Sequence, residues 1–547
     1  MKTIFKSTLV FALAAGATLT SCIDEVEPTN GVTQDQLDGS IKAGEAMIAA
    51  MPGHMVAWNS GYQEWHGDFG YSSMMHIRDL MTGDMTTNGN GLNYDQWWPY
   101  EEAYVTESSA YAQRIWNYYT VQVQTSNIAA AYYNADIESE AGKGARAIAL
   151  AFRAMSYLDM ARWYEFLPNS LTTAINSKGN DVTGLTVPIV TEYTTEEEAR
   201  NNPRATRQEM VDFILSDLKY AEENIQYSSY AGDKLFPGLD CVYGLYSRLY
   251  MWIEDYNKAA EYAEKALNAA KQYGRSVLRE DEWTNTSTGF NTLETPSWMW
   301  GLKFEKENRP VTSGICNWTS MVSAETEYGY AAVLNLPYLG PGACPVVDAS
   351  MYDRIPDTDF RKFSWIAPAG TALANSTPLI EPTYIRYFAN YGPYCAIKFR
   401  PGMGNTTDYT VGSSTAVPVM RIEEMWFNYI ESVAHTSPAQ GKTLLEQWMQ
   451  TYRDENYTCS ATSQDDIIEE IIFQKRVEFW GEGLTFWDIK RLNYSVTRDY
   501  PGTNFYGDAA FNSVGRPAWM NMVFVQTEGN NNAGVANWNN PDFSQYY

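Results

Sequence analysis

The sequence is poor in the residue patterns that most often carry catalysis or hold metals. Its 547 residues include four histidines, which form no HExxH or other paired spacing. A histidine-bound metal is therefore not expected. No GxxxxGK[ST], GxGxxG or GxSxG run occurs, so the phosphate-binding loops and the serine-hydrolase elbow are absent as well. We expect neither a metal nor a cofactor.

Cysteine is scarce too, with six residues in the chain. Cys22 lies near the N-terminus, and the other five are widely spaced and odd in number: Cys241, Cys316, Cys344, Cys395 and Cys459. This spacing gives neither a disulfide framework nor a zinc pattern. We expect these five side chains to be packed thiols.

Positive charge is in deficit, since 39 Lys and Arg face 66 Asp and Glu for a net charge of −27. Such a field disfavours nucleic acid and anionic polymers and favours a neutral ligand. Aromatic residues are abundant, at 14% with 18 Trp and 39 Tyr. Most aromatic side chains in proteins pack in the core. In an acidic chain the excess also suits flat stacking surfaces for uncharged ligands such as sugars.

The N-terminus predicts export. A positively charged start leads into an apolar core at residues 9–19, which is shorter than the ~20 residues that span a bilayer. The tetrapeptide Leu19-Thr20-Ser21-Cys22 resembles a bacterial lipobox. It predicts removal of residues 1–21 and lipidation of Cys22, whereas an ordinary signal peptide with an incidental cysteine is the alternative. Residues 22–40 are polar and turn-prone and suit a flexible tether.

Apolar residues recur at helical spacing through much of 41–280 and 419–492. Residues 143–166 predict one long helix, and Thr206 with Glu209 forms a capping box that opens another. Further helices are expected over 419–435, 441–456 and 465–479. The pattern predicts a mainly α fold.

One helical pair carries the 9-4-3 spacing of a tetratricopeptide repeat at Tyr250, Ala259, Ala263 and Ala266. A plain helical hairpin would show the same single copy. Residues 281–418 alternate Tyr, Trp, Gly, Pro, Asn and Thr and predict a loop-rich, short-strand insertion. Residues 493–547 read as an irregular tail, so 41–547 is expected to form a single domain.

Two late segments resemble signatures of the SusD/RagB family. They are PVMRIEEMWFNYIES at 418–432 and QKRVEFWGEGLTFWDIKR at 474–491, the second similar to the family pattern ERxxELxFEGxRxxDLxR. The matching positions of the second are Arg476, Glu478, Phe479, Gly483, Phe486, Asp488 and Arg491. The sequence departs from the pattern at Gln474, where an acid is usual, and at Leu484, where arginine is frequent. With the lipobox, the 143–166 helix and the repeat near Tyr250, the resemblance spans nearly the whole mature chain.

The residues of these segments predict a structural role on their own. Arg421, Glu424, Asn428 and Glu431 lie at i, i+3, i+7 and i+10, on one face of a helix. A charged seam between packed helices would be completed by Arg476, Glu478, Asp488 and Arg491. Buried charges are tolerable only when they pair. We therefore expect these motifs to build the scaffold and not the ligand site.

The resemblance implies a SusD-like fold, in which a tetratricopeptide-type helical scaffold carries the insertion. It also implies a lipid-anchored glycan-binding protein at the cell surface, on the outer membrane. Such a protein is not an enzyme. Its partner would be a SusC-like TonB-dependent porin, to which it delivers a neutral oligosaccharide or polysaccharide.

A sugar site needs flat aromatic faces and polar groups for the hydroxyls. Three clusters qualify, and their residues are Arg78, Asp84, Asn88, Asn90, Trp97, Trp98 and Tyr100; Trp298 and Trp300; and Asn317, Trp318, Tyr328 and Tyr330. Core packing is the alternative for every aromatic among them. Several tryptophans suit a flat β-glucan or a hemicellulose such as xyloglucan. A peptide-binding family member and a glycoside hydrolase remain alternatives. Counting carboxylates does not decide the second, because chance alone brings carboxylate pairs close in an acidic protein.

Overall fold

The computed structural model describes residues 41–58, 67–87, 105–314, 317–329, 345–374, 393–505 and 507–546. The chain divides into two units, Met1–Ala46 and Met47–Tyr547. The predicted signal peptide (1–21) and tether (22–40) lie outside the described residues. Helix α3 (Ile41–Met55) opens the described part. Within this part, no helix is long and apolar enough to cross a membrane.

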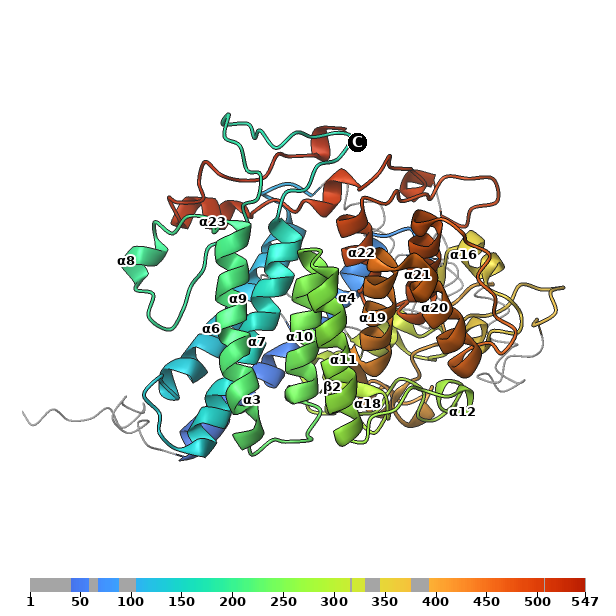
Figure 1. Ribbon diagram of the computed structural model, residues 1–547, viewed down its shortest axis with the longest axis horizontal. Coiled ribbons are helices and arrows are strands. Elements are labelled where there is room, and N and C mark those ends of the chain that lie inside the picture. The colour runs from blue at the N-terminus through green and yellow to red at the C-terminus, as the bar shows by residue number, and fades with distance from the viewer. Residues whose placement is uncertain are drawn as a thin grey trace, which may run out of the picture. The chain divides into compact units, whose positions relative to one another are not determined.

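The second unit is mainly helical, as the sequence predicts. Its main helices before the insertion are α4 (Tyr71–Leu80), α6 (Ala110–Tyr132), α7 (Glu140–Tyr164), α8 (Glu196–Ala199), α9 (Arg207–Asn224), α10 (Leu239–Trp252) and α11 (Tyr256–Gln272). Those after it are α19 (Ile422–Thr436), α20 (Pro438–Tyr452), α21 (Gln464–Glu478), α22 (Thr485–Leu492) and α23 (Gln526–Asn531). The long helices pack in succession, α6 on α7, α7 on α9, α10 on α11 and α11 on α19 (Figure 1).

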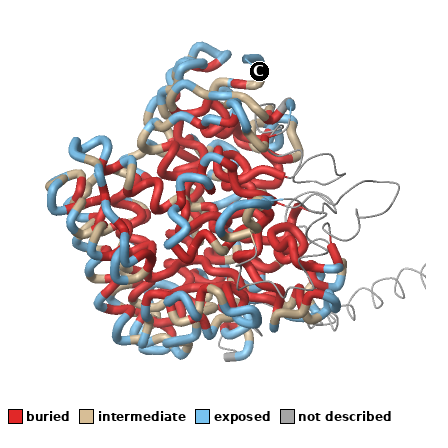
Figure 2. The backbone as a smooth tube through the Cα atoms, turned by 90° about the vertical axis from the view of Figure 1, so that its right-hand side faces the viewer, coloured by how far each residue is buried: buried red, intermediate tan, exposed pale blue. Residues whose placement is uncertain are grey.

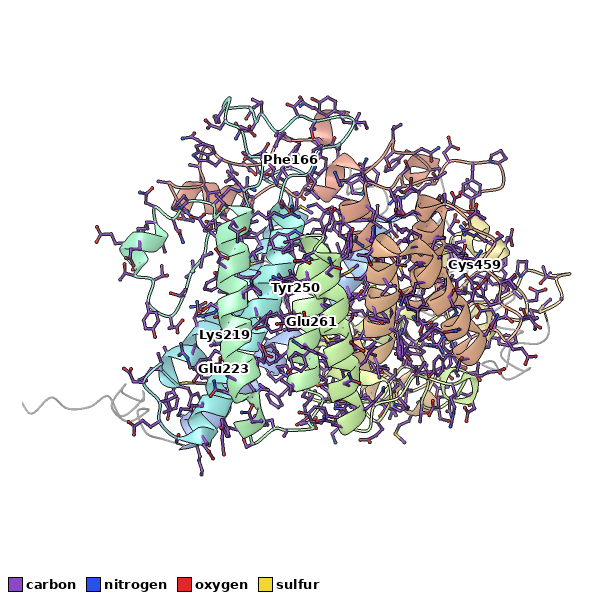
Figure 3. All side chains as sticks on the ribbon, viewed as in Figure 1. Phe166, Lys219, Glu223, Tyr250, Glu261 and Cys459 are labelled. Carbon is purple, nitrogen blue, oxygen red and sulfur yellow. The ribbon has the colours of Figure 1, made fainter. Side chains whose placement is uncertain are left out.

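Local sequence explains how two of these helices begin and pack. Thr206 caps α9 with the predicted box, because its hydroxyl accepts from Glu209 N at 3.2 Å and the Glu209 carboxylate accepts from Thr206 N at 2.8 Å. Ala259, Ala263 and Ala266 are buried where α11 meets its neighbours. Their small side chains allow the close packing of α10 and α11, which carry Tyr250 and Glu261 in Figure 3.

The described part of the insertion contains loops and short strands, as predicted, and also short helices that were not predicted. Strand β1 (Met85–Thr87) pairs antiparallel with β3 (Pro345–Val347), and β2 (Trp298–Lys303) pairs antiparallel with β4 (Ala416–Arg421). The short helices are α12 (Glu280–Trp283), α13 (Arg309–Thr312), α14 (Trp318–Val322), α16 (Ala349–Arg354) and α18 (Tyr409–Gly412).

One helix start was predicted wrongly. The helix expected over 419–435 begins at Ile422, because residues 416–421 form the strand that pairs with β2. Arg421 is therefore the N-cap residue of α19 and does not lie inside the helix. The remaining helices end within a few residues of the expected positions, as is usual for helix boundaries.

The charged seam is present and centres on Glu478, whose side chain is fully buried. Arg453 binds its two oxygens at 2.8 Å each, Arg361 lies at 3.2 Å and Arg421 at 3.3 Å. These arginines hold the pKa of Glu478 well below its usual range.

The rest of the seam joins α21 and α22 to α19. Arg491 bonds to Glu431 and, at 2.9 Å, to Asp488. Arg476 does not join this seam, since its guanidinium binds Asp84 with an Nε–Oδ1 distance of 2.8 Å. Figure 2 shows the buried segments gathered inside the second unit, with exposed segments along its edges.

The thiol prediction is confirmed for three cysteines. Cys241, Cys395 and Cys459 are buried and free, and burial raises the pKa of Cys241 and Cys459. Cys316 and Cys344 lie outside the described residues.

Candidate ligand-binding site

Several of the described site residues lie on or next to a small framework, which we call the insertion framework: β1, β3, α14 and residues 393–400. Val346 of β3 bridges to Cys395, and Ala324, just after α14, donates its N–H to Ala396 O at 2.9 Å. The framework therefore links four segments that are far apart in the sequence. It is the ordered base from which the predicted ligand loops depart.

The tryptophans of this region lie in the core. Trp298 and Trp300 of β2 have no exposed surface, and Trp318 of α14 is 1% exposed. Trp300 packs edge-on against Phe152 with ring centroids 4.9 Å apart, and Trp318 packs edge-on against Phe399 at 5.0 Å. None offers a face to a sugar in this structure. The placement favours core packing, the alternative that the sequence left open.

The reason is that β2 is covered on both faces. Strand β2 packs against α10 on one side and pairs with β4 at its edge, and five of its six residues are buried. Alternation along a strand identifies one exposed face only when that face is solvated. Here the spacing of Trp298 and Trp300 could not distinguish a sugar platform from a core strand.

Arg78 and Asp84 are also internal. Arg78 lies near the end of α4 and donates from Nε to Gly483 O at 2.8 Å and from Nη1 to Tyr119 OH at 3.2 Å. Asp84 accepts from Arg476. The segment that the sequence presented as a ligand loop is thus helical up to Leu80, and both side chains are engaged in packing the scaffold.

Asn317 and Tyr328 stabilise the insertion itself. Asn317 caps α14, since its side chain accepts from Ser320 N at 3.0 Å. Tyr328 packs near Tyr409, and burial raises the pKa of its phenol. The remaining predicted residues lie outside the described residues and stay predictions: Asn88, Asn90, Trp97, Trp98, Tyr100, Tyr330 and the lipidation site Cys22.

The structure also places polar groups here that the sequence did not single out. The hydroxyls of Thr86 and Thr87 on β1 are buried and have no hydrogen-bond partner. One oxygen of Glu325 is unpartnered as well, although this residue forms an ion pair with Arg400. Nothing in the sequence marks these residues, because short runs of Thr and Glu are common on solvated loops.

The described carboxylates do not assemble an evident hydrolytic site. Burial raises the pKa of Asp79 and of Glu325 to about 7, the range of a general acid. However, Asp79 accepts from Gly483 N at 2.9 Å and Glu325 pairs with Arg400, and neither lines a cavity described here. Within the described part of the chain, no group of three or more His, Cys, Asp or Glu could hold a metal ion.

Three cavities formed by described residues contain no predicted ligand residue. One, of about 50 Å³, lies within the charged scaffold beside Arg162, Arg248 and Lys490. The other two, of about 640 and 680 Å³, share Thr191, Thr194 and Asn202 as lining residues.

Two family models match the chain. One, described as starch-binding and associating with the outer membrane, matches residues 60–251, and the other, the SusD family, matches residues 375–542. Fold and matches together define the class: carbohydrate-binding proteins associated with the outer membrane. The chain is similar to the SusD/RagB family over both matched stretches. Its members are cell-surface proteins that bind and do not catalyse, and they act with a glycan ligand and a SusC-type partner.

Solved structures share the fold at low sequence identity. A SusD-like carbohydrate-binding protein from Bacteroides vulgatus aligns with a TM-score of 0.67 and 18% identity, over 90% of this chain and 96% of that one. A SusD superfamily protein from Bacteroides thetaiotaomicron aligns with a TM-score of 0.64 and 17% identity, over 91% and 99%. A SusD-like carbohydrate-binding protein from Bacteroides fragilis gives 0.62 and 14%, over 91% and 99%. No curated protein sequence matches the chain.

Proposed function

We propose that this protein captures a neutral glycan at the cell surface and delivers it to a SusC-like TonB-dependent transporter. The similarity to the SusD/RagB family over residues 60–251 and 375–542 carries the proposal. The net charge of −27 supports a neutral ligand, because an acidic surface repels anionic polymers. Attachment to the outer membrane through a lipid on Cys22 is part of the proposal and is supported by the lipobox.

The ligand we propose is a β-glucan or a hemicellulose such as xyloglucan. Such chains present flat sugar faces, which stack on aromatic rings. Since Trp298, Trp300 and Trp318 are buried, the proposal assigns the stacking faces to Trp97, Trp98 and Tyr100, in a stretch rich in Gly and Asn.

A glycan array followed by isothermal titration tests this function. The lipidated protein should be held in a detergent without a sugar headgroup, so that the detergent cannot compete. We expect neutral β-linked oligosaccharides to bind between millimolar and micromolar, or about −4 to −8 kcal/mol. Polygalacturonate, an anionic polymer, is the matched control and should not bind. Binding to peptides and to no glycan would refute the proposal and would favour the peptide-binding alternative.

The same sample tests for hydrolysis. An oligosaccharide incubated with the protein for a day should be recovered intact, since the proposed function is binding and the two carboxylates with a pKa raised to about 7, Asp79 and Glu325, line none of the three cavities. New reducing ends in proportion to protein would contradict this expectation.

A further inference from the structure

A cavity of about 640 Å³ lies between α6, α7, the segment 188–202 and α23. This volume falls within the ~300–1,000 Å³ typical of small-ligand sites. In Figure 1, α6, α8 and α23 lie on the left of the second unit, whereas α16 of the insertion lies on the right. The cavity is therefore separate from the insertion framework.

A mostly buried aromatic side chain, Trp116, which is 6% exposed, forms part of the cavity wall and is held in one orientation. Trp116 of α6 packs edge-on against Tyr164 and Phe524, with ring centroids 5.3 and 5.1 Å away. Ile128, roughly 18 Å further along α6, keeps half of its surface exposed and adds an apolar wall. A rigid indole loses little conformational entropy when a ligand packs on it.

Polar groups surround this apolar surface at several points. The Glu528 carboxylate of α23 accepts from Asn532 Nδ2 at 2.9 Å and from the Trp116 indole. A carboxylate has about four acceptor positions, so Glu528 retains capacity for ligand hydroxyls. The amides of Gln124 and Asn531 also line the cavity. The side-chain N–H of Asn531 donates to Thr527 O at 2.8 Å.

The neighbouring cavity extends this surface into a longer groove. The two share Thr191, Thr194 and Asn202, and the second adds Tyr193, which is 66% exposed. A surface that continues from one cavity into the next suits a chain of several units better than a single ring.

Charge selects against acidic ligands. The residues lining the two cavities include five glutamates and one arginine, Arg200, which is paired with Glu196 at 2.5 Å. Glu192 is neutralised by Arg146 and Arg153, so Glu197, Glu198 and Glu528 supply most of the negative charge. An acidic ligand would meet repulsion there. Aromatic faces, amides and a carboxylate together suit a neutral molecule rich in hydroxyls.

We propose that this groove is a second carbohydrate-binding site, which takes a neutral oligosaccharide segment with Trp116 beside the sugar ring and Glu528 bound to its hydroxyls. The proposal does not depend on the loops of the insertion. A second site on the helical scaffold would hold one part of a long chain while another part is bound elsewhere. Two sites joined by one ligand raise the overall affinity without new contacts at either.

Hydrogen–deuterium exchange of the lipidated protein tests the site locally. The probes are cello-, xylogluco- and malto-oligosaccharides, with a neutral peptide of similar length as a separate arm. We expect an oligosaccharide to protect peptides from residues 116–131 and 188–202. In the Ala131→Trp variant an exposed residue of the lining becomes bulky, and the concentration needed for this protection should rise about tenfold or more. Ala439→Trp, at an exposed position on α20 away from the cavity, should behave as wild type.

Glu528→Gln keeps the shape of the side chain and removes its charge, and it should weaken the same protection about threefold to tenfold. Unchanged protection in Ala131→Trp would overturn the proposal, as would protection by the peptide and by no sugar. Sugar binding that protects only other segments would overturn this second site and leave the proposed function standing. Absence of sugar binding anywhere would refute both.

Discussion

Replacing Glu478 with glutamine should strongly destabilise the fold. The carboxylate is fully buried and lies within 3.3 Å of three guanidinium groups. A glutamine has nearly the same shape, but its NH₂ group would face arginines that cannot accept a hydrogen bond. The substitution therefore leaves buried positive charge unbalanced while causing little change in packing.

The size of the effect follows from the burial of the cluster. Breaking a buried ion pair by removing one partner costs about 3–5 kcal/mol. Unfolding entropy is about 2.1 cal/mol/K per residue, or about 1 kcal/mol/K for the unit Met47–Tyr547. A loss of about 4 kcal/mol should therefore lower the Tm by about 4 °C.

Differential scanning calorimetry at pH 7 measures this shift, with Glu261→Gln as the control. Glu261 pairs with Lys265 at 2.7 Å, but both side chains are exposed (Figure 3). Its loss should cost at most about 1 kcal/mol. The folded-state pKa of Glu478 is depressed, so its contribution is present above the ordinary glutamate pKa and is lost as the pH falls. The Tm values of the wild-type protein and of Glu478→Gln should therefore converge in acid. Equal shifts for both variants at pH 7 would refute this view of the cluster.

Three further outcomes are expected. Cys22→Ala should release the protein from the membrane fraction, and full retention on fractionation would contradict the lipobox. Trp98→Ala should weaken glycan binding by about 1–3 kcal/mol with an unchanged Tm, whereas Trp300→Ala should cost about 3–5 kcal/mol of stability. Titration measures the first effect and calorimetry the second, and the reverse pattern would overturn the assignment. Burial raises the folded-state pKa of Asp79 from 3.8 to about 7. The stability that the fold loses by keeping this carboxyl buried therefore grows as the pH rises from about 4 to about 7. Asp79→Asn should therefore stabilise the fold by about 4 kcal/mol at pH 8, which raises the Tm by about 4 °C. Near pH 4 it should change the Tm little. A Tm equal to that of the wild-type protein at both pH values would refute this.

The helical scaffold was predictable because its signals are local. Capping boxes, periodic apolar residues and small residues at a helix contact act within a few turns, and the α9 box and the α10–α11 pair match the prediction. The start of α19 was not predictable in this way. Residues 416–421 become a strand because β2 lies beside them, and that partner is more than a hundred residues away in the sequence.

The candidate site was less predictable for the same reason. An aromatic side chain in a polar stretch gives no local sign of whether another segment covers it, and Trp318 is covered by Phe399. Arg78 likewise finds its partner in Gly483, far along the chain. The departure at Gln474 is harmless for a reason that only the structure gives, since its side-chain oxygen accepts from Arg361.

The late signature joins the scaffold to the insertion. Glu478 binds Arg453 of the scaffold and Arg361 of the insertion, and Glu482 binds Arg421 and, at 2.7 Å, Lys398.

The same segment fixes the start of β1. Arg476 binds the Asp84 side chain, and Trp480 donates its indole N–H to Asp84 O at 2.9 Å. Strand β1 leads directly into the stretch that contains Trp97 and Trp98. The late signature is thus tied to the residue that directly precedes β1. Removing Arg476 would leave the buried Asp84 carboxylate without this partner, and an uncompensated buried charge is costly.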